Sequence, residues 1–327
     1  MRWVMKFPVL LIALMLSMAM MLSVGATEIM LVDLLTGRAD AVSETIFWEI
    51  RLPRVLLAII VGAGVSVAGA VIQGLFRNPL ADPALIGVSS GAALFAAGYM
   101  VLDLHTTAFG LLGVSGSAFV GGLLISWLVL EIGKRSGTVS SMLLAGIAFN
   151  SIAIAGVGLF SYLSSDLELR SVTFWALGSF NGADWSGVSI ALIIPVAIVL
   201  LIRESKNLNA VTLGDKEAYY LGIDITRLRQ RIVVLTAVIV GVGVALTGIV
   251  AFVGLVVPHL VRLTSSSNHS VVIPGSALLG AILVLLADGA GRSIIAPAEL
   301  PIGILTALLG GPFFVYLIMR QKGKLGI

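Results

Sequence analysis

Ten apolar stretches, most of them about as long as a bilayer is thick, constrain this 327-residue chain more than any other feature. They lie at about 7–24, 54–76, 87–102, 108–131, 139–163, 187–202, 231–250, 252–263, 271–290 and 302–319. A transmembrane helix takes ~20 residues, and only short loops separate these stretches. The sequence therefore predicts an all-α integral membrane protein with about ten transmembrane helices, built as a single domain over residues 1–327.

Composition excludes other classes of protein. Charged residues make up 11% of the chain and hydrophobic residues 58%, whereas a soluble domain is about 25% charged. A soluble enzyme and a disordered chain are both excluded, because each needs far more polar surface. Cysteine is absent, so neither disulfides nor thiolate metal sites can form. The three histidines, His105, His259 and His269, are too scattered to indicate a metal centre, and we expect this chain to bind no metal or other cofactor.

The N-terminal stretch allows two interpretations. Arg2 and Lys6 precede an 18-residue apolar run, and Val24-Gly25-Ala26 is similar to a signal-peptidase site. The run is longer than the ~7–15 residues of a usual signal core, which favours a retained first helix at about 3–25. The stretch at 252–263 is too short to cross a ~30 Å hydrocarbon core. It predicts a half-length helix, with its ends covered by protein or water.

The basic residues predict an orientation. With a cytoplasmic N-terminus, the inner side holds 15 of the 20 Lys and Arg residues, so both termini should be cytoplasmic. The outer arginines Arg51, Arg54 and Arg292 run against this trend. Either they reach headgroups or pair with Asp288 and Glu299, or they form a docking surface for acidic groups of an external partner.

The longest inner segment is a loop at about 203–231. Its centre, from Leu213 to Gly222, has the pattern of a short amphipathic helix ended by Gly222. This segment is either a solvated loop or a docking helix that receives force from a partner.

Residues 166–185 predict an aromatic outer loop. Either an interfacial aromatic belt or a gate for a large, flat substrate explains its aromatic side chains.

One motif raises the possibility of an enzyme. Gly87-Val-Ser-Ser-Gly91 matches G-x-S-x-G, but a hydrolase would need a strand-to-helix elbow and a nearby His base. Ser89 and Ser90 open an apolar helix, so capping and packing explain them better.

ATP-driven transport would need a partner, because the chain has no P-loop motif through which to bind ATP. Few charges lie in the spans, which disfavours a proton- or ion-coupled carrier that works alone. Such a stand-alone carrier remains the alternative from a different class.

Several segments together resemble the permeases that import iron complexes and cobalamin, the FecCD/BtuC type. They occur in order between about residues 48 and 320, and the ten-span count agrees with that family. They are Arg51-Leu-Pro-Arg54, Gly69-Ala-Val-Ile-Gln-Gly74, Asn78-Pro-Leu-Ala-Asp-Pro83, Leu85-Ile-Gly-Val-Ser-Ser-Gly91, Leu144-Ala-Gly146, Leu213-Gly214 with Leu221-Gly222, Gly254-Leu-Val-Val-Pro-His259 and Glu299-Leu-Pro-Ile-Gly303.

The resemblance implies an importer that is not itself an enzyme. A second copy of the chain, two cytoplasmic ATPases that bind ATP and Mg, and a periplasmic or lipid-anchored binding protein would complete it in the bacterial inner membrane. The binding protein would dock on Arg51, Arg54 and Arg292. The ATPases would couple through Leu213, Gly214, Asp215, Lys216, Glu217, Ala218, Leu221 and Gly222. The translocation path or gate would involve Ser140, Ser141, Asn150, Ser151, Arg170, Phe174 and Trp175.

The cargo follows less directly. The family carries haem, ferric siderophores and cobalamin. Thr173-Phe-Trp-Ala-Leu-Gly-Ser179 and Ala296-Pro-Ala-Glu-Leu-Pro301 look most like haem or ferric-complex permeases. We therefore rank haem first, a ferric siderophore second and cobalamin third.

Overall fold

A computed structural model describes residues 6–23, 36, 38–102, 110–136, 138–296 and 298–322. Within these ranges every regular element is a helix, and none is a strand. Six helical spans are long and apolar enough to cross a membrane, and four shorter apolar helices accompany them. The predicted all-α membrane fold is confirmed.

The apolar helices follow the ten predicted stretches. In chain order they are α1 (Lys6–Ser23), α4 (Leu52–Leu75), α5 (Val88–Val101), α6 (Gly110–Ser136), α7 (Val139–Leu163), α9 (Trp185–Ala191) with α10 (Ile193–Arg203), α13 (Ile225–Thr247), α14 (Val253–Thr264), α15 (His269–Ser293) and α16 (Ile302–Lys322). Helix α14 has 12 residues, as the half-length prediction requires. The Val24-Gly25-Ala26 site and His105 lie outside the described residues.

Shorter elements join these helices. They are α3 (Ala41–Thr45), the π-helical turn η1 (Ile46–Arg51), the 3₁₀ turn η2 (Pro83–Ile86), α8 (Asp166–Ala176), α11 (Ser205–Leu213) and α12 (Asp215–Tyr220). Helix α8 occupies the first part of the predicted outer loop at 166–185, and the resemblance to the importer permeases implies such a short helix beside the fifth span. Ser165 and Glu168 form a capping box that starts this helix, and the S-x-x-E spacing is a helix-start signal that the aromatic residues obscured.

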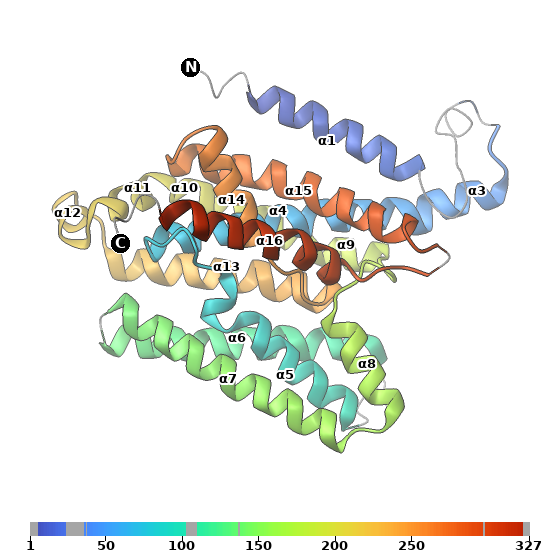
Figure 1. The fold of residues 1–327 in the computed structure, drawn as a ribbon, viewed down its shortest axis with the longest axis horizontal. Coiled ribbons are helices and arrows are strands. Elements are labelled where there is room, and N and C mark those ends of the chain that lie inside the picture. The colour runs from blue at the N-terminus through green and yellow to red at the C-terminus, as the bar shows by residue number, and fades with distance from the viewer. Residues whose placement is uncertain are drawn as a thin grey trace.

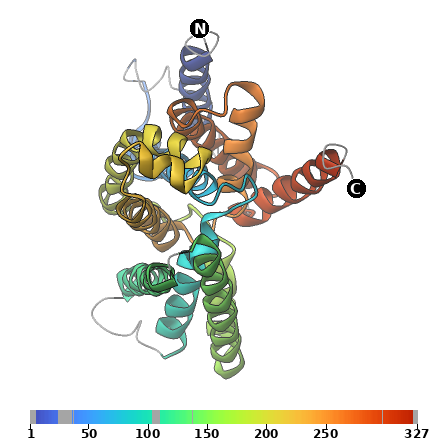
Figure 2. The ribbon, with the colours of Figure 1, turned by 90° about the vertical axis from the view of Figure 1, so that its left-hand side faces the viewer.

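Helices α4 and α13 occupy the centre of the bundle. Helices α1, α14, α15 and α16 lie on one side of them and α5, α6 and α7 on the other (Figures 1 and 2). The span that contains α4 has 78% of its most apolar window buried, whereas α7 has only 17%. A single chain therefore leaves α7 as an open flank.

Small residues allow the close packing of α4. Gly62, Ser66, Ala70 and Gly74 recur every four residues on one face, and this face packs along α15. A Cβ atom at Gly62 would lie 2.6 Å from the carbonyl oxygen of Gly280 on α15. Close backbone approach of this kind is how helices associate in lipid, where apolar burial supplies little drive.

The connecting elements gather at two opposite ends. Helices α3 and α8 lie at one end, and α11 and α12 lie at the other (Figure 1). Helix α1 begins, and α16 ends, at the end that holds α11 and α12. The two clusters of interest below belong to these two ends.

Candidate functional site

Arg54 forms the centre of an ion-pair network at the α3 end of the bundle. Its guanidinium donates from Nε and Nη2 to the two Asp288 carboxylate oxygens at 3.1 and 2.9 Å, and from Nη1 and Nη2 to the Glu299 oxygens at 2.9 Å each. Arg54 and Asp288 are both buried. The alternative interpretation of this arginine, pairing with Asp288 and Glu299, is confirmed.

The other two arginines of this cluster hold the end of α1. Arg51 is buried, and its Nη1 donates to the carbonyl oxygens of Leu22 and Ser23 at 2.9 and 2.8 Å. Arg292 pairs with Asp288 at 3.3 Å and donates to Met21. Cations suit the negative C-terminal end of a helix dipole. Both arginines therefore fasten the first helix to the bundle.

The cluster keeps a positive excess. Three arginines face two carboxylates, Asp288 and Glu299, which leaves a net charge of +1 if all five groups are ionised. Glu299 is the more exposed acid, with 33% of its side chain accessible. A docking role for the three arginines stays a prediction. An external carboxylate would compete with Glu299 for the Arg54 guanidinium.

The segment at 203–231 is more helical than the sequence predicted. Gly214, with φ of 144°, separates α11 from α12, so the expected helix from Leu213 to Gly222 is shorter than predicted. Gly222 has φ of 82° and ends α12 as predicted. Its N–H donates to Tyr219 at 2.9 Å, and the next N–H, of Ile223, donates to Ala218 at 3.1 Å. This pair of bonds is a Schellman motif.

Asp215 ties α12 to the long helices. It forms ion pairs with Arg77, just past the end of α4, and with Arg229 near the start of α13, the latter at 2.6 Å. Arg77 has φ of 50°, a left-handed conformation that is uncommon outside glycine. A displacement of α12 would therefore reach α4 and α13 directly.

The tip of this segment is apolar and accessible. Leu213, Tyr219, Tyr220 and Leu221 are exposed, Tyr220 by 84%. Lys216 and Glu217 are also exposed, whereas Ala218 is buried against the bundle. Exposed aromatic side chains of this kind are typical of protein interfaces.

The predicted path residues lie on α7 and α8, which are neighbours in the bundle. Ser140 and Ser151 are exposed, Asn150 is half-buried, and the Ser141 hydroxyl lies 2.8 Å from that of Thr138 in the cap of α7. On α8, Arg170 and Phe174 are exposed and Trp175 is half-buried. Helix α7 has 25 residues and is about 37 Å long. Ser140 and Arg170 therefore lie near opposite ends of it and do not form one compact site.

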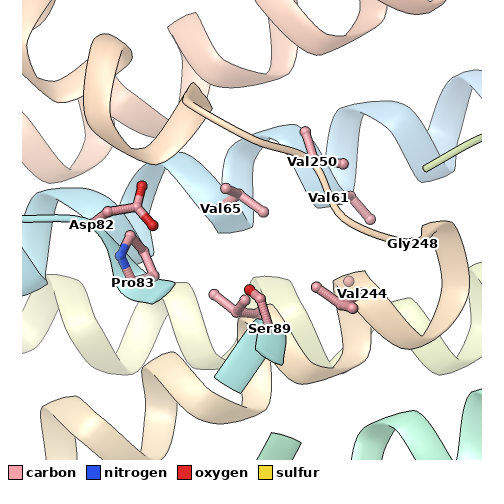
Figure 3. A pocket seen from close by; sticks show the side chains of 10 residues that line it. Val61, Val65, Asp82, Pro83, Ser89, Val244, Gly248 and Val250 are labelled. Carbon is pink, nitrogen blue, oxygen red and sulfur yellow. The ribbon is translucent and has the colours of Figure 1, made fainter. Parts of the chain in front are cut away.

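The G-x-S-x-G segment forms the first turn of α5, but the predicted capping by Ser89 and Ser90 is wrong, because Gly87 is the N-cap residue and no side chain caps this helix. Ser89 faces a cavity of about 20 Å³ between α4, α13 and η2, together with Asp82 and Pro83 (Figure 3). Such a volume holds about one water molecule, and no histidine is among the described residues that line it. Ser90 donates to the Gly87 carbonyl at 3.1 Å.

Comparison with known proteins agrees with this architecture. Residues 9–320 match the FecCD transport family. The chain is 44% identical over 281 residues to the hemin transport system permease protein HmuU of Yersinia pestis, covering 85% of this chain and 84% of that protein. It is 40% identical to the vitamin B12 import system permease protein BtuC of Salmonella paratyphi A, covering 98% and 95%.

Solved structures show the same fold. A metal-chelate type ABC transporter in an inward-facing conformation superposes with a TM-score of 0.88 at 32% identity, covering 96% of this chain and 99% of that one. PsaBC from Streptococcus pneumoniae, solved with a Fab, has a TM-score of 0.58 at 18% identity over 88% of this chain and 95% of its own. The second likeness concerns the fold alone.

We predict that Arg54→Met lowers stability by ~3–5 kcal/mol, because it leaves Asp288 buried with fewer donors. Thermal unfolding of the purified chain in detergent measures the loss. The double variant Arg54→Met with Asp288→Leu should regain part of it, since the stranded charge is gone. Arg38→Met is the matched control, because Arg38 is exposed. Equal stability of Arg54→Met and the control would contradict a structural role for this network.

Proposed function

Because the chain belongs to the FecCD transport family, whose members are permease subunits of ABC importers, we propose that it moves haem across the bacterial inner membrane. The observation that carries the choice of cargo is the 44% identity to a permease named for hemin, against 40% to one named for vitamin B12. A ferric siderophore and cobalamin are the alternative cargoes, in that order.

The proposed assembly contains two copies of this chain, two ATPases and an external binding protein. The open flank of α7 supports a second copy or a path on that side, because only 17% of its apolar window is buried within one chain. Helix α16 also exposes large apolar side chains, including Leu308, Leu309 and Val315. ATP and Mg would be bound by the ATPases.

Both termini are proposed to be cytoplasmic. The distribution of Lys and Arg supports this orientation. The geometry supports it too, because α1 begins and α16 ends at the end that carries α11 and α12 (Figure 1). The arginine cluster around Arg54 then faces the outside.

The proposed mechanism is alternating access. Closure of the ATPase dimer would push on the exposed aromatic tip of α12. The ion pairs of Asp215 with Arg77 and Arg229 would carry this displacement to α4 and α13. Helices α7 and α16, with α8, would then open or close the path at the subunit interface. A path that binds cargo only weakly lets the cargo leave.

We predict that cells lacking this gene take up less labelled haem, and that the intact gene restores uptake only with an active partner ATPase. A ferric siderophore panel and cobalamin, measured in the same cells, test the alternative cargoes. If uptake of one of those cargoes is lost instead of haem uptake, the proposed cargo is wrong but the assignment as an ABC importer permease stands. Transport by the chain alone in liposomes, driven by an ion gradient, would instead support a stand-alone carrier.

We predict that Asp215→Asn lowers transport several-fold while the partner ATPase still hydrolyses ATP. The substitution weakens the ion pairs that connect α12 to Arg77 and Arg229, but it leaves the exposed tip unchanged. Transport per ATP hydrolysed, in proteoliposomes with the complete importer, measures the effect. Lys206→Gln is the control, since Lys206 is an exposed lysine on the neighbouring helix α11 and is not one of the predicted coupling residues. An unchanged ratio in Asp215→Asn would refute the coupling role.

We predict that Glu299→Gln strengthens capture of the external binding protein several-fold at low salt. The change removes the accessible carboxylate that competes for Arg54 and raises the positive excess of the cluster. The dissociation constant of the purified permease and binding protein measures it, and added salt should weaken the gain. Unchanged affinity alongside lower thermal stability would mean that the three arginines serve the fold only.

A further inference from the structure

We propose that the groove between the inner ends of α10 and α13 binds one anionic phospholipid, with its phosphate against Arg203 and Arg231. Which leaflet of the membrane supplies the lipid depends on the orientation proposed above, but the binding of the lipid does not. The groove has a volume of about 560 Å³ and a mostly apolar surface, to which Leu200, Val234 and Leu235 contribute. Both arginines line it.

The apolar part continues along lipid-facing surface. On α13, Arg227, Arg231, Val234 and Leu235 follow helical spacing and share one face. Val234 is 50% exposed, and Leu200 on α10 is 40% exposed. An acyl chain laid along this face would contact apolar side chains over two helices.

The polar part is a second pocket that opens beside the first. It has a volume of about 220 Å³ and shares Glu204 and Arg231 with the groove. Arg227, Asn207 and the turn at Gly222 complete its wall. An apolar groove that meets a polar, arginine-lined pocket matches the two parts of a phospholipid, and basic pockets at this level of a bundle suit anionic headgroups.

The charges favour an anion. Glu204 is only 12% exposed and is already engaged, with one oxygen at 3.1 Å from Arg231 and the other at 2.6 Å from Asn207. Asp224 caps α13 and pairs with Arg227. Arg231 keeps 62% of its side chain accessible.

Arg203 supplies the remaining positive charge. It is exposed and has no ion pair within the described part of the chain. The five charged groups around the two pockets, three arginines and two acids, leave +1, which one phosphodiester of a singly charged lipid would balance.

Native mass spectrometry of the full chain in detergent tests the proposal. The probes are phosphatidylglycerol and phosphatidylethanolamine with identical acyl chains. The double variant Arg203→Gln with Arg231→Gln should bind phosphatidylglycerol about 25-fold more weakly, at about fivefold per arginine, and should change phosphatidylethanolamine binding far less. Gln at 231 can still donate to Glu204, so the helix contact is kept. Arg135→Gln is the matched control, an exposed α6 arginine paired with Glu131 at the same end.

A second arm separates lipid from free phosphate. Val234→Trp fills the apolar groove and leaves every charge in place, so it should also weaken phosphatidylglycerol binding. Glycerophosphoglycerol, which has the headgroup but no acyl chains, should not displace the lipid. Equal binding of the two lipids, equal loss in the Arg135→Gln control, or full displacement by glycerophosphoglycerol would each overturn the proposal. Haem uptake is not a readout here, so the proposed function and this inference can fail separately.

Discussion

The close contact of α4 with α15 is the constraint on which the ion-pair clusters at both ends of the bundle depend. Lipid tails are as apolar as the helices, so helices associate in a bilayer through close packing and polar contacts. Gly62 and Gly74 let α4 approach α15 where larger residues would collide. Helix α4 has 24 residues and is about 36 Å long. It carries Arg54 at one end, and Arg77 follows its other end, so one rigid element joins the ion pairs of Arg54 to those of Asp215.

A polar anchor fixes the half-length helix α14 against α4. Gln73 Nε2 donates to the carbonyl oxygens of Gly254 and Leu255 at 3.3 Å each, and Gln73 Oε1 accepts a hydrogen bond from Arg262. Helix α14 follows Phe252, which has φ of 63°, a conformation that a bulky residue rarely adopts. Irregular backbone at membrane depth is tolerated only where protein or water covers it, and α4 supplies that cover.

The sequence predicts those features that depend on residues close together in the chain. Apolar length alone gave all ten apolar helices, and the positive φ of Gly222 follows from its place after an amphipathic turn. The sequence does not predict α11, because its residues, Ser205–Leu213, are mostly polar and contain no long apolar run. The choice between docking and pairing for Arg54 could not be made, because Asp288 and Glu299 are 234 and 245 residues away in the chain. Such contacts depend on topology, which no local pattern encodes.

The arginines in the first two turns of α13 point in two different directions. Residues two apart on a helix point about 200° apart, so Arg229 faces Asp215 while Arg227 and Arg231 turn to the opposite side, toward the groove with Glu204. The proposed coupling contact and the proposed lipid groove therefore lie on the same helix but on different faces of it. A headgroup bound at Arg231 would reach the coupling helix only through movement of α13 as a rigid body. A measurement of lipid binding therefore tests the lipid groove directly, whereas a measurement of transport would also report on the proposed coupling contact.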